Sequence, residues 1–304
     1  MIQSKTYIAV PPGETIKEQL AYKNMPQEKF SEEMKLSPEN TEKLLNGTIH
    51  LTSDMAYRLE YVLGIPKIFW ENLEKIYRKT IYKALLENDA KIARKFPLKE
   101  MQKRHWIKKG RSKEEEDAKI LRRYFEVDCI SSMLSEKSFP IDSRCLKKKD
   151  STDTALLTWA QQARIISRTI NVSPISVQRL RDAIPDLRTL SLKTTTEFCP
   201  ILLKELALCG IALVFLPHLP GSYLHALTFR EKQKLVICLS AHGKDDDKFW
   251  FSLFHEIGHI LNGDIDKKGA RTEDDERKAD EFARVTLIPD RDFTQFVNRI
   301  LYGQ

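Results

Sequence analysis

The sequence predicts an α+β protein that is mainly helical and carries a small β-sheet. Before Gly210, apolar residues recur at the three- and four-residue spacing of helices, between clear helix start and stop signals. After Gly210 the pattern changes to three short apolar runs, at 211–216, 226–229 and 235–239, which are typical of strands. Two further helices are expected after them. A length of 304 residues is sufficient for two domains.

Composition excludes several classes of protein. The chain is 41% hydrophobic and 31% charged, as expected of a folded globular protein. No apolar run approaches the roughly 20 residues of a membrane span, and the N-terminus lacks the apolar core of a signal peptide. The 5 cysteines are scattered, without metal or redox spacing. We therefore expect a cytoplasmic protein with reduced thiols and no membrane partner.

Residues 12–77 predict five short helices. The clearest start is Ser37-Pro38-Glu39, which combines a capping serine, proline at the first helical position and an acid in the first turn. That helix is expected to end at Asn46-Gly47. The starts of the other four are marked by Gly13, Pro26, Thr52 and Pro66. These helices define a first domain over residues 1–77.

Charge is distributed unevenly along the chain. Residues 1–77 hold 9 Lys+Arg against 11 Asp+Glu, whereas residues 78–150 hold 21 against 12, a net charge of +9. Residues 151–304 are balanced at 20 against 20. The middle segment is predicted to be a basic helical linker, and its positive charge is compatible with phosphate contacts.

The last predicted domain covers residues 151–304. Helices are expected over 154–169, 175–183 and 196–209, before the three strands. The strands at 226–229 and 235–239 are expected to be joined by a turn over 230–234. Of the two final helices, one contains the histidines discussed next and the other runs from about Glu273 to Leu287.

The pentad His255-Glu256-Ile257-Gly258-His259 is the strongest functional signal. A helix places residues four apart on one face, so both imidazoles point to one location, as a zinc ion requires. Glu256 lies beside that location and suits a base that takes a proton from water. The alternative is two histidines that are packed or solvated on a helix without a metal. The preceding strands and the following acidic helix favour the metal site.

A third protein ligand is expected downstream. Helical geometry favours Glu276, because it lies on the same face as Ala279 and Ala283. Asp280, one turn further on, is placed to accept the spare N–H of a ligating histidine. The carboxylates considered were Asp264, Asp266, Glu273, Asp274, Asp275, Glu276, Asp280 and Glu281.

His225, before the second predicted strand of this domain, is a candidate transition-state donor. The sequence provides no partner for it, so a surface or packing role is favoured.

The C-terminal residues resemble the ImmA/IrrE family of metallopeptidases. The resemblance rests on Asp247–Phe251, the pentad with Ile260 and Leu261, Glu276, Ala279–Ala283 and Leu287-Ile288-Pro289. It implies a gluzincin-like core, with His255, His259 and Glu276 as ligands of one Zn²⁺ and Glu256 as the base. Characterised members cleave repressor proteins. The family commonly has Asn at position 280, and either residue can accept the hydrogen bond.

Residues 12–77 resemble the XRE/HigA-type helix-turn-helix domain. The matching positions are Pro12-Gly13-Glu14, Gln27, Phe30-Ser31, Leu44-Leu45-Asn46-Gly47, Leu59 and Phe69-Trp70. The resemblance implies that the helix from Ser37 to Leu45 enters the major groove, with Gln27, Glu39, Asn40 and Lys43 as candidate DNA contacts.

A helical bundle for dimerisation or partner capture is the alternative for this domain. Glu39 and Glu42 repel phosphate and favour that alternative, and Lys35 replaces the glycine common at the turn.

Together these patterns predict a zinc endopeptidase that cleaves a repressor or partner protein and binds double-stranded DNA through its helix-turn-helix, with a homodimer as a compatible assembly. The main alternative is an antitoxin-like transcriptional repressor whose metal site is structural or vestigial. A third option is a toxin whose protease acts on host proteins.

Overall fold

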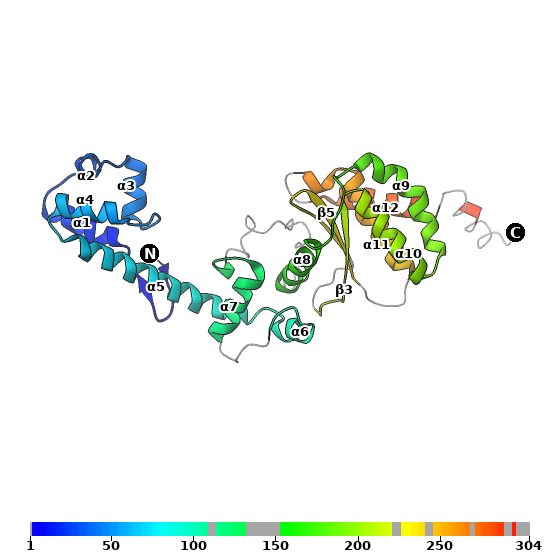
Figure 1. Cartoon of the computed structure of the whole chain (residues 1–304), viewed down its shortest axis with the longest axis horizontal. Helices are drawn as coiled ribbons and strands as arrows, with labels where there is room; N and C mark the ends of the chain where they lie inside the picture. Colours follow the sequence, from blue (N-terminus) through cyan, green and yellow to red (C-terminus); the bar gives the residue numbers. More distant parts are fainter. Residues whose placement is uncertain are drawn as a thin grey trace. The chain divides into compact units, whose positions relative to one another are not determined.

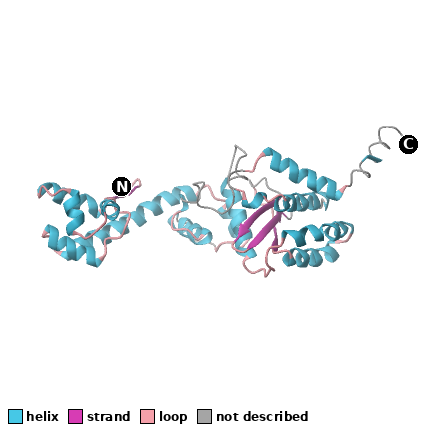
Figure 2. Ribbon diagram, turned by 90° about the horizontal axis from the view of Figure 1, so that it is seen from above, coloured by secondary structure: helices cyan, strands magenta, loops and turns pink. Residues whose placement is uncertain are grey.

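The computed structural model describes residues 2–108, 114–131, 153–220, 226–240, 246–267, 271–288 and 294–295. The chain divides into two compact units, one formed by Met1–Arg94 with Gly110–Ser131 and the other by Lys95–Lys109 with Ser132–Gln304. Both are mainly helical and each contains a small sheet (Figures 1 and 2), which confirms the predicted α+β class. Within the described ranges, no helix is long and apolar enough to span a membrane.

The first unit contains the five predicted helices. They are α1 (Pro12–Tyr22), α2 (Gln27–Glu33), α3 (Pro38–Leu45), α4 (Ser53–Leu63) and α5 (Lys67–Ala93). The predicted caps form: the Ser37 side chain accepts a hydrogen bond from the Asn40 backbone, and Thr52 accepts one from Met55. Lys35, in the turn between α2 and α3, has a φ of 50°, the left-handed conformation for which glycine is more usual.

An N-terminal hairpin was not predicted. Strand β1 (Ile2–Gln3) pairs antiparallel with β2 (Ile8–Ala9), and both contact α5. The Glu87 carboxylate holds the hairpin by accepting hydrogen bonds from the Ser4 hydroxyl at 2.7 Å and the Thr6 amide at 3.1 Å. Two-residue strands are too short to show an alternating pattern, so the sequence carried no signal for them.

Helix α5 extends well beyond Tyr77 and ends at Ala93. The predicted domain limit at residue 77 therefore falls inside a continuous helix, and the three-part division of the chain stays a prediction. Two short helices follow, α6 (Leu98–Lys103) and α7 (Glu114–Phe125). Helix α7 packs on α5, where Arg122 Nε donates a 2.6 Å hydrogen bond to the buried Asp89 carboxylate. Part of the basic segment thus belongs to the same compact unit as the first four helices.

The second unit is built on a three-stranded sheet. Its strands are β3 (Ile211–Leu216), β4 (Ala226–Glu231) and β5 (Lys234–Ser240), in the order β3-β5-β4. Strand β5 is parallel to β3 and antiparallel to β4. All three were predicted, but the turn between β4 and β5 is shorter than the expected 230–234. The ladder continues to Glu231 and Lys234, because Lys232 adopts a left-handed φ of 54° that closes a tight turn.

Helices cover both faces of this sheet (Figure 2). Helix α8 (Asp153–Ser167) packs against the side chains of Val214, Val236 and Cys238. On the other face, Leu213 and Ile237 pack against α9 (Val177–Thr189), α10 (Thr195–Leu208) and α11 (Asp246–Leu261). Helix α12 (Glu273–Leu287) packs on α11, and the described residues of this unit also form the 3₁₀ turns η3 (Leu190–Leu192) and η4 (Asp264–Asp266) and helix α6. The helices predicted in this region are therefore present.

Gly13 provides a test of the packing in the first unit. A Cβ at this position would lie 1.9 Å from the backbone oxygen of Leu45, at the end of α3. Alanine usually stabilises a helix by about 1 kcal/mol relative to glycine. We expect Gly13→Ala to lower the free energy of unfolding instead, by about 2 kcal/mol, because the backbones must separate.

Chemical denaturation measures this loss, and hydrogen exchange over residues 12–45 localises it to α1 and α3. Lys75→Ala, an exposed change on α5, is the control and should alter stability by less than about 0.5 kcal/mol. A Gly13→Ala protein as stable as the wild type would show that α1 and α3 are not in this close contact.

Candidate metal centre

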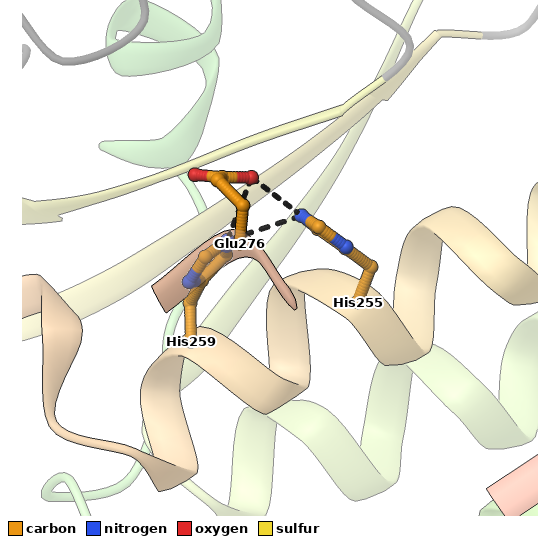
Figure 3. A group of neighbouring side chains, drawn as sticks. All are labelled: His255, His259 and Glu276. Carbon is orange, nitrogen blue, oxygen red and sulfur yellow. Dashed lines mark hydrogen bonds and ion pairs between the residues drawn. The ribbon is translucent and has the colours of Figure 1, made fainter. Parts of the chain in front are cut away.

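Helices α11 and α12 bring three potential metal donors together (Figure 3). The Nε2 atoms of His255 and His259 are 3.0 Å apart. The Oε2 atom of Glu276 lies 3.3 Å from the first nitrogen and 3.5 Å from the second. Tetrahedral ligands about 2.0–2.1 Å from a shared zinc ion are about 3.3 Å from one another. The three donors therefore fit a zinc ion in both type and spacing.

The two helices approach closely because Gly258 has no side chain. A Cβ at Gly258 would lie 3.1 Å from the Cα of Ala279 and 3.2 Å from the ring of Phe282. Ala279 and Ala283 are fully buried in this contact. Helix α12 occupies the space that the missing side chain of Gly258 leaves beside the histidines. Glu276, one turn before Ala279, is thereby held over the two imidazoles.

A carboxylate lies next to the Nδ1 atom of each imidazole ring. The Nδ1 atom of His255 is 2.8 Å from Asp280 Oδ1, and that of His259 is 2.9 Å from Asp264 Oδ2. A carboxylate at Nδ1 favours the tautomer with the proton on that nitrogen, which leaves the Nε2 lone pair free for a metal. Asp280 lies where the sequence predicted it. Asp264 had been considered only as a ligand, and its position behind His259 was not foreseen.

Asp264 also connects the site to the start of α12. It is fully buried in η4, and the Lys267 ammonium contacts both Asp264 and Asp275. Asp275 accepts a hydrogen bond from the Thr272 backbone at 2.9 Å, and the Thr272 hydroxyl accepts one from the Asp275 amide. This reciprocal cap fixes the first turn of α12, the turn that carries Glu276.

The charges of the site favour a cation. Hydrogen bonding to His255 and then to His259 holds the pKa of Glu276 well below its usual range. Burial of the His255 ring acts to lower its pKa, but Glu276, Glu256 and Asp280 together outweigh burial and raise the pKa of His255. Carboxylates around the imidazoles thus stabilise a positive charge between them, which a divalent metal ion would supply.

Glu256 is buried beside this cluster, with a relative exposure of 4%. Its Oε2 atom has no hydrogen-bond partner among the described residues, and the nearest cationic atom is Arg271 Nη1, at 3.9 Å. A buried carboxylate oxygen without a donor is available to accept a proton. The sequence predicted Glu256 as the base, but not Arg271 beside it, because Arg271 precedes α12 and has no helical spacing relation to the pentad. His225 lies outside the described residues.

The candidate DNA contacts are all exposed on the first unit. Gln27 begins α2, and Asn40 and Lys43 lie one turn apart on α3. Lys43 Nζ is 2.6 Å from Glu39 Oε1, so the only lysine of α3 is already paired with an acid. Asn40 and Lys43 thus lie on the same exposed helix, and the surface around them carries both positive and negative charges.

Comparison with known proteins gives matches in both parts of the chain. Residues 209–304 match the Peptidase_M78 family, described as the IrrE N-terminal-like domain. The N-terminal part is similar to the uncharacterized HTH-type transcriptional regulator YddM of Escherichia coli strain K12. The two sequences are 33% identical over 66 residues, which is 22% of this chain and 70% of that protein. The chain therefore belongs, through its N-terminal part, with the HTH-type transcriptional regulators, and its residues 209–304 match the M78 peptidase family.

Proposed function

We propose that the second unit is a peptidase that binds one Zn²⁺ and hydrolyses a peptide bond in a repressor or another partner protein. The observation that carries this proposal is the convergence of two imidazole nitrogens and a carboxylate oxygen, 3.0–3.5 Å apart, beside the buried Glu256. The M78 family match supports it.

In this mechanism His255, His259 and Glu276 would hold the ion. When bound, zinc would polarise a peptide carbonyl and make a water molecule more acidic. Glu256 would take the proton from the water and later deliver it to the nitrogen of the leaving amine. Its buried Oε2 atom has no competing hydrogen-bond donor in the described part of the chain, which suits both steps.

The substrate is proposed to be an extended segment of a protein. Strand β4 lies at an edge of the sheet and packs against α11, next to the candidate metal centre. An edge strand presents unpaired backbone groups that can pair with an added strand. A flexible segment of a repressor could bind there with its backbone close to Glu256.

We further propose that the first unit binds double-stranded DNA through α3, in the cytoplasm, as a homodimer that contacts two half-sites. The similarity to an HTH-type regulator and the exposed positions of Asn40 and Lys43 support DNA binding. Exposed Glu39 and Glu42 on the same helix limit the electrostatic contribution to affinity. Binding is therefore expected to depend on base contacts more than on phosphate contacts.

A second candidate function is an antitoxin-like transcriptional repressor in which the metal site is structural or vestigial, and the similarity to an HTH-type transcriptional regulator supports its regulatory part. The two candidates differ in what Glu256 does. A peptidase needs its carboxylate, whereas a structural site needs only the three donors.

Substitution of Glu256 tests the peptidase function directly. We expect zinc-loaded Glu256→Gln to lose at least about 100-fold in cleavage rate and to keep its zinc, because the amide cannot accept the proton. Mass spectrometry of partner proteins encoded nearby, incubated with the full chain, detects the cleavage. Glu281→Gln, an exposed carboxylate on α12, is the control and should remain active. Cleavage that persists in Glu256→Gln would exclude this mechanism.

Zinc affinity tests the carboxylates around the imidazoles. We expect Asp280→Ala to weaken zinc binding roughly 10–100-fold, because His255 loses the partner at its Nδ1 atom. Glu276→Ala should weaken it further, since a donor is removed. Competition with a chromophoric chelator measures both.

Asp274→Ala is the matched control for Asp280→Ala. Asp274 lies on the same helix, is exposed, and pairs with Arg277 and Lys278 instead of a histidine. It should bind zinc like the wild type. Unchanged affinity in Asp280→Ala and Glu276→Ala would show that the ion binds elsewhere.

DNA binding can be measured by fluorescence anisotropy on the upstream DNA of the protein's own gene, at several salt concentrations. We expect Asn40→Ala to lose preference for that DNA over an unrelated sequence. Lys43→Ala should weaken binding and, if Lys43 contacts phosphate, lower the salt slope by about 1. Lys17→Ala removes a lysine of α1 that is similarly paired, with Glu14 at 2.8 Å, and should have no effect. Equal affinity of the wild type for both sequences would contradict specific binding.

A further inference from the structure

We propose that Arg271 is the positioning residue of Glu256. Its guanidinium compensates the negative charge of the carboxylate and orients it through an ion pair. This pair leaves the oxygen that accepts the proton free. This inference rests on the proposed peptidase function. It proposes one more residue of the site besides the three candidate metal donors and the base. This residue would affect the reaction only through Glu256.

The side chain of Arg271 is buried beside Glu256. The side chains of Arg271 and Glu256 are only 8% and 6% exposed, and Arg271 Nη1 lies 3.9 Å from Glu256 Oε2. A guanidinium is rarely buried to this extent unless an anion balances its charge. In the described part of the chain, Glu256 is the carboxylate within ion-pair distance of Arg271. Each side chain therefore compensates the charge of the other.

The pair is attractive but not hydrogen-bonded. A separation of 3.9 Å is too long for a hydrogen bond, yet short for two charges in a site with little water. Among the described residues, both Glu256 Oε2 and Arg271 Nε lack a hydrogen-bond partner. The guanidinium can thus hold the carboxylate in place without occupying the lone pair that accepts the proton.

Two other buried carboxylates show the contrasting arrangement. Asp89 accepts a 2.6 Å hydrogen bond from Arg122, and Glu231 accepts one of the same length from Arg164. Both pairs join elements of the fold, since Asp89 connects α5 to α7 and Glu231 connects β4 to α8. The 3.9 Å separation between Arg271 and Glu256 is therefore wider than the 2.6 Å hydrogen bonds of these two structural arginine–carboxylate pairs.

Two neighbouring elements determine where Arg271 lies. Its Nη2 atom donates to the Thr228 backbone oxygen of β4 at 3.4 Å, which ties the guanidinium to the edge strand. Its backbone precedes Thr272, the cap of α12. Residues 271–276 thus supply both the partner of the base and the carboxylate of the candidate metal centre. Within the described residues Arg271 makes no hydrogen bond or ion pair with a candidate ligand, so its effect on the site passes through Glu256.

Kinetics of the zinc-loaded full chain test this role, with the partner protein that the wild type cleaves as substrate. We expect Arg271→Met to lower kcat about 10–100-fold, while KM and zinc affinity change by less than about threefold. Arg271→Lys should recover part of the rate, because an ammonium restores the charge. Arg277→Met, an exposed arginine of α12, is the control. A loss of zinc affinity equal to the loss of rate, or a more active Arg271→Met, would overturn the inference.

A double-mutant cycle tests the pair without any substrate. In the zinc-loaded protein, Glu256→Gln should lower the unfolding midpoint, because it leaves the Arg271 charge buried and uncompensated. The same change made together with Arg271→Met should lower it less than the sum of the two single effects. Coupling supports the pairing even if the wild type cleaves none of the tested proteins, a failure that would count against the peptidase function alone. Additive effects would overturn the inference.

Discussion

The close contact between α11 and α12 is the constraint on which the candidate site depends. Gly258 and Ala279 lie where the two helix backbones meet, and a Cβ at Gly258 would come within 3.1 Å of the Cα of Ala279. This contact places Glu276 of α12 next to both imidazole rings of α11. Without α12, only the four-residue spacing of His255 and His259 along α11 would bring the two rings together. The core below, between α11 and the sheet, keeps α11 in place through buried residues such as Leu253 and Ile257. The donors therefore converge because of the packing of the two helix backbones.

The carboxylates next to the Nδ1 atoms of the two histidines favour metal binding at the Nε2 atoms. Asp280 and Asp264 hold the outer nitrogens of the two imidazoles, so the inner nitrogens face one another with their lone pairs available. Lys267 links Asp264 to the capped first turn of α12 and thus to Glu276. These contacts form one connected polar network above the apolar core. A network of this kind restricts the orientations of its side chains, which reduces the cost of binding an ion.

Local signals in the sequence were sufficient for much of this architecture. Helical periodicity alone predicted that His255 and His259 point to one location and that Glu276 faces them, and the structure brings these three side chains together. Asp264 and Arg271 could not be assigned in this way. Asp264 lies in a 3₁₀ turn after α11, and Arg271 lies just before the cap of α12. Their positions therefore depend on the path of the chain between the two helices. The β1–β2 hairpin was missed for a similar reason, since its contacts are with Glu87, far along the chain.

We propose that two histidines and a carboxylate of these helices hold a zinc ion. X-ray absorption spectroscopy of the zinc-loaded full chain tests it most directly, because the ligand shell is observed without a substrate. We expect nitrogen and oxygen neighbours at about 2.0–2.1 Å with the scattering pattern of two imidazoles. Sulfur neighbours at about 2.3 Å, or a shell without imidazole, would contradict it.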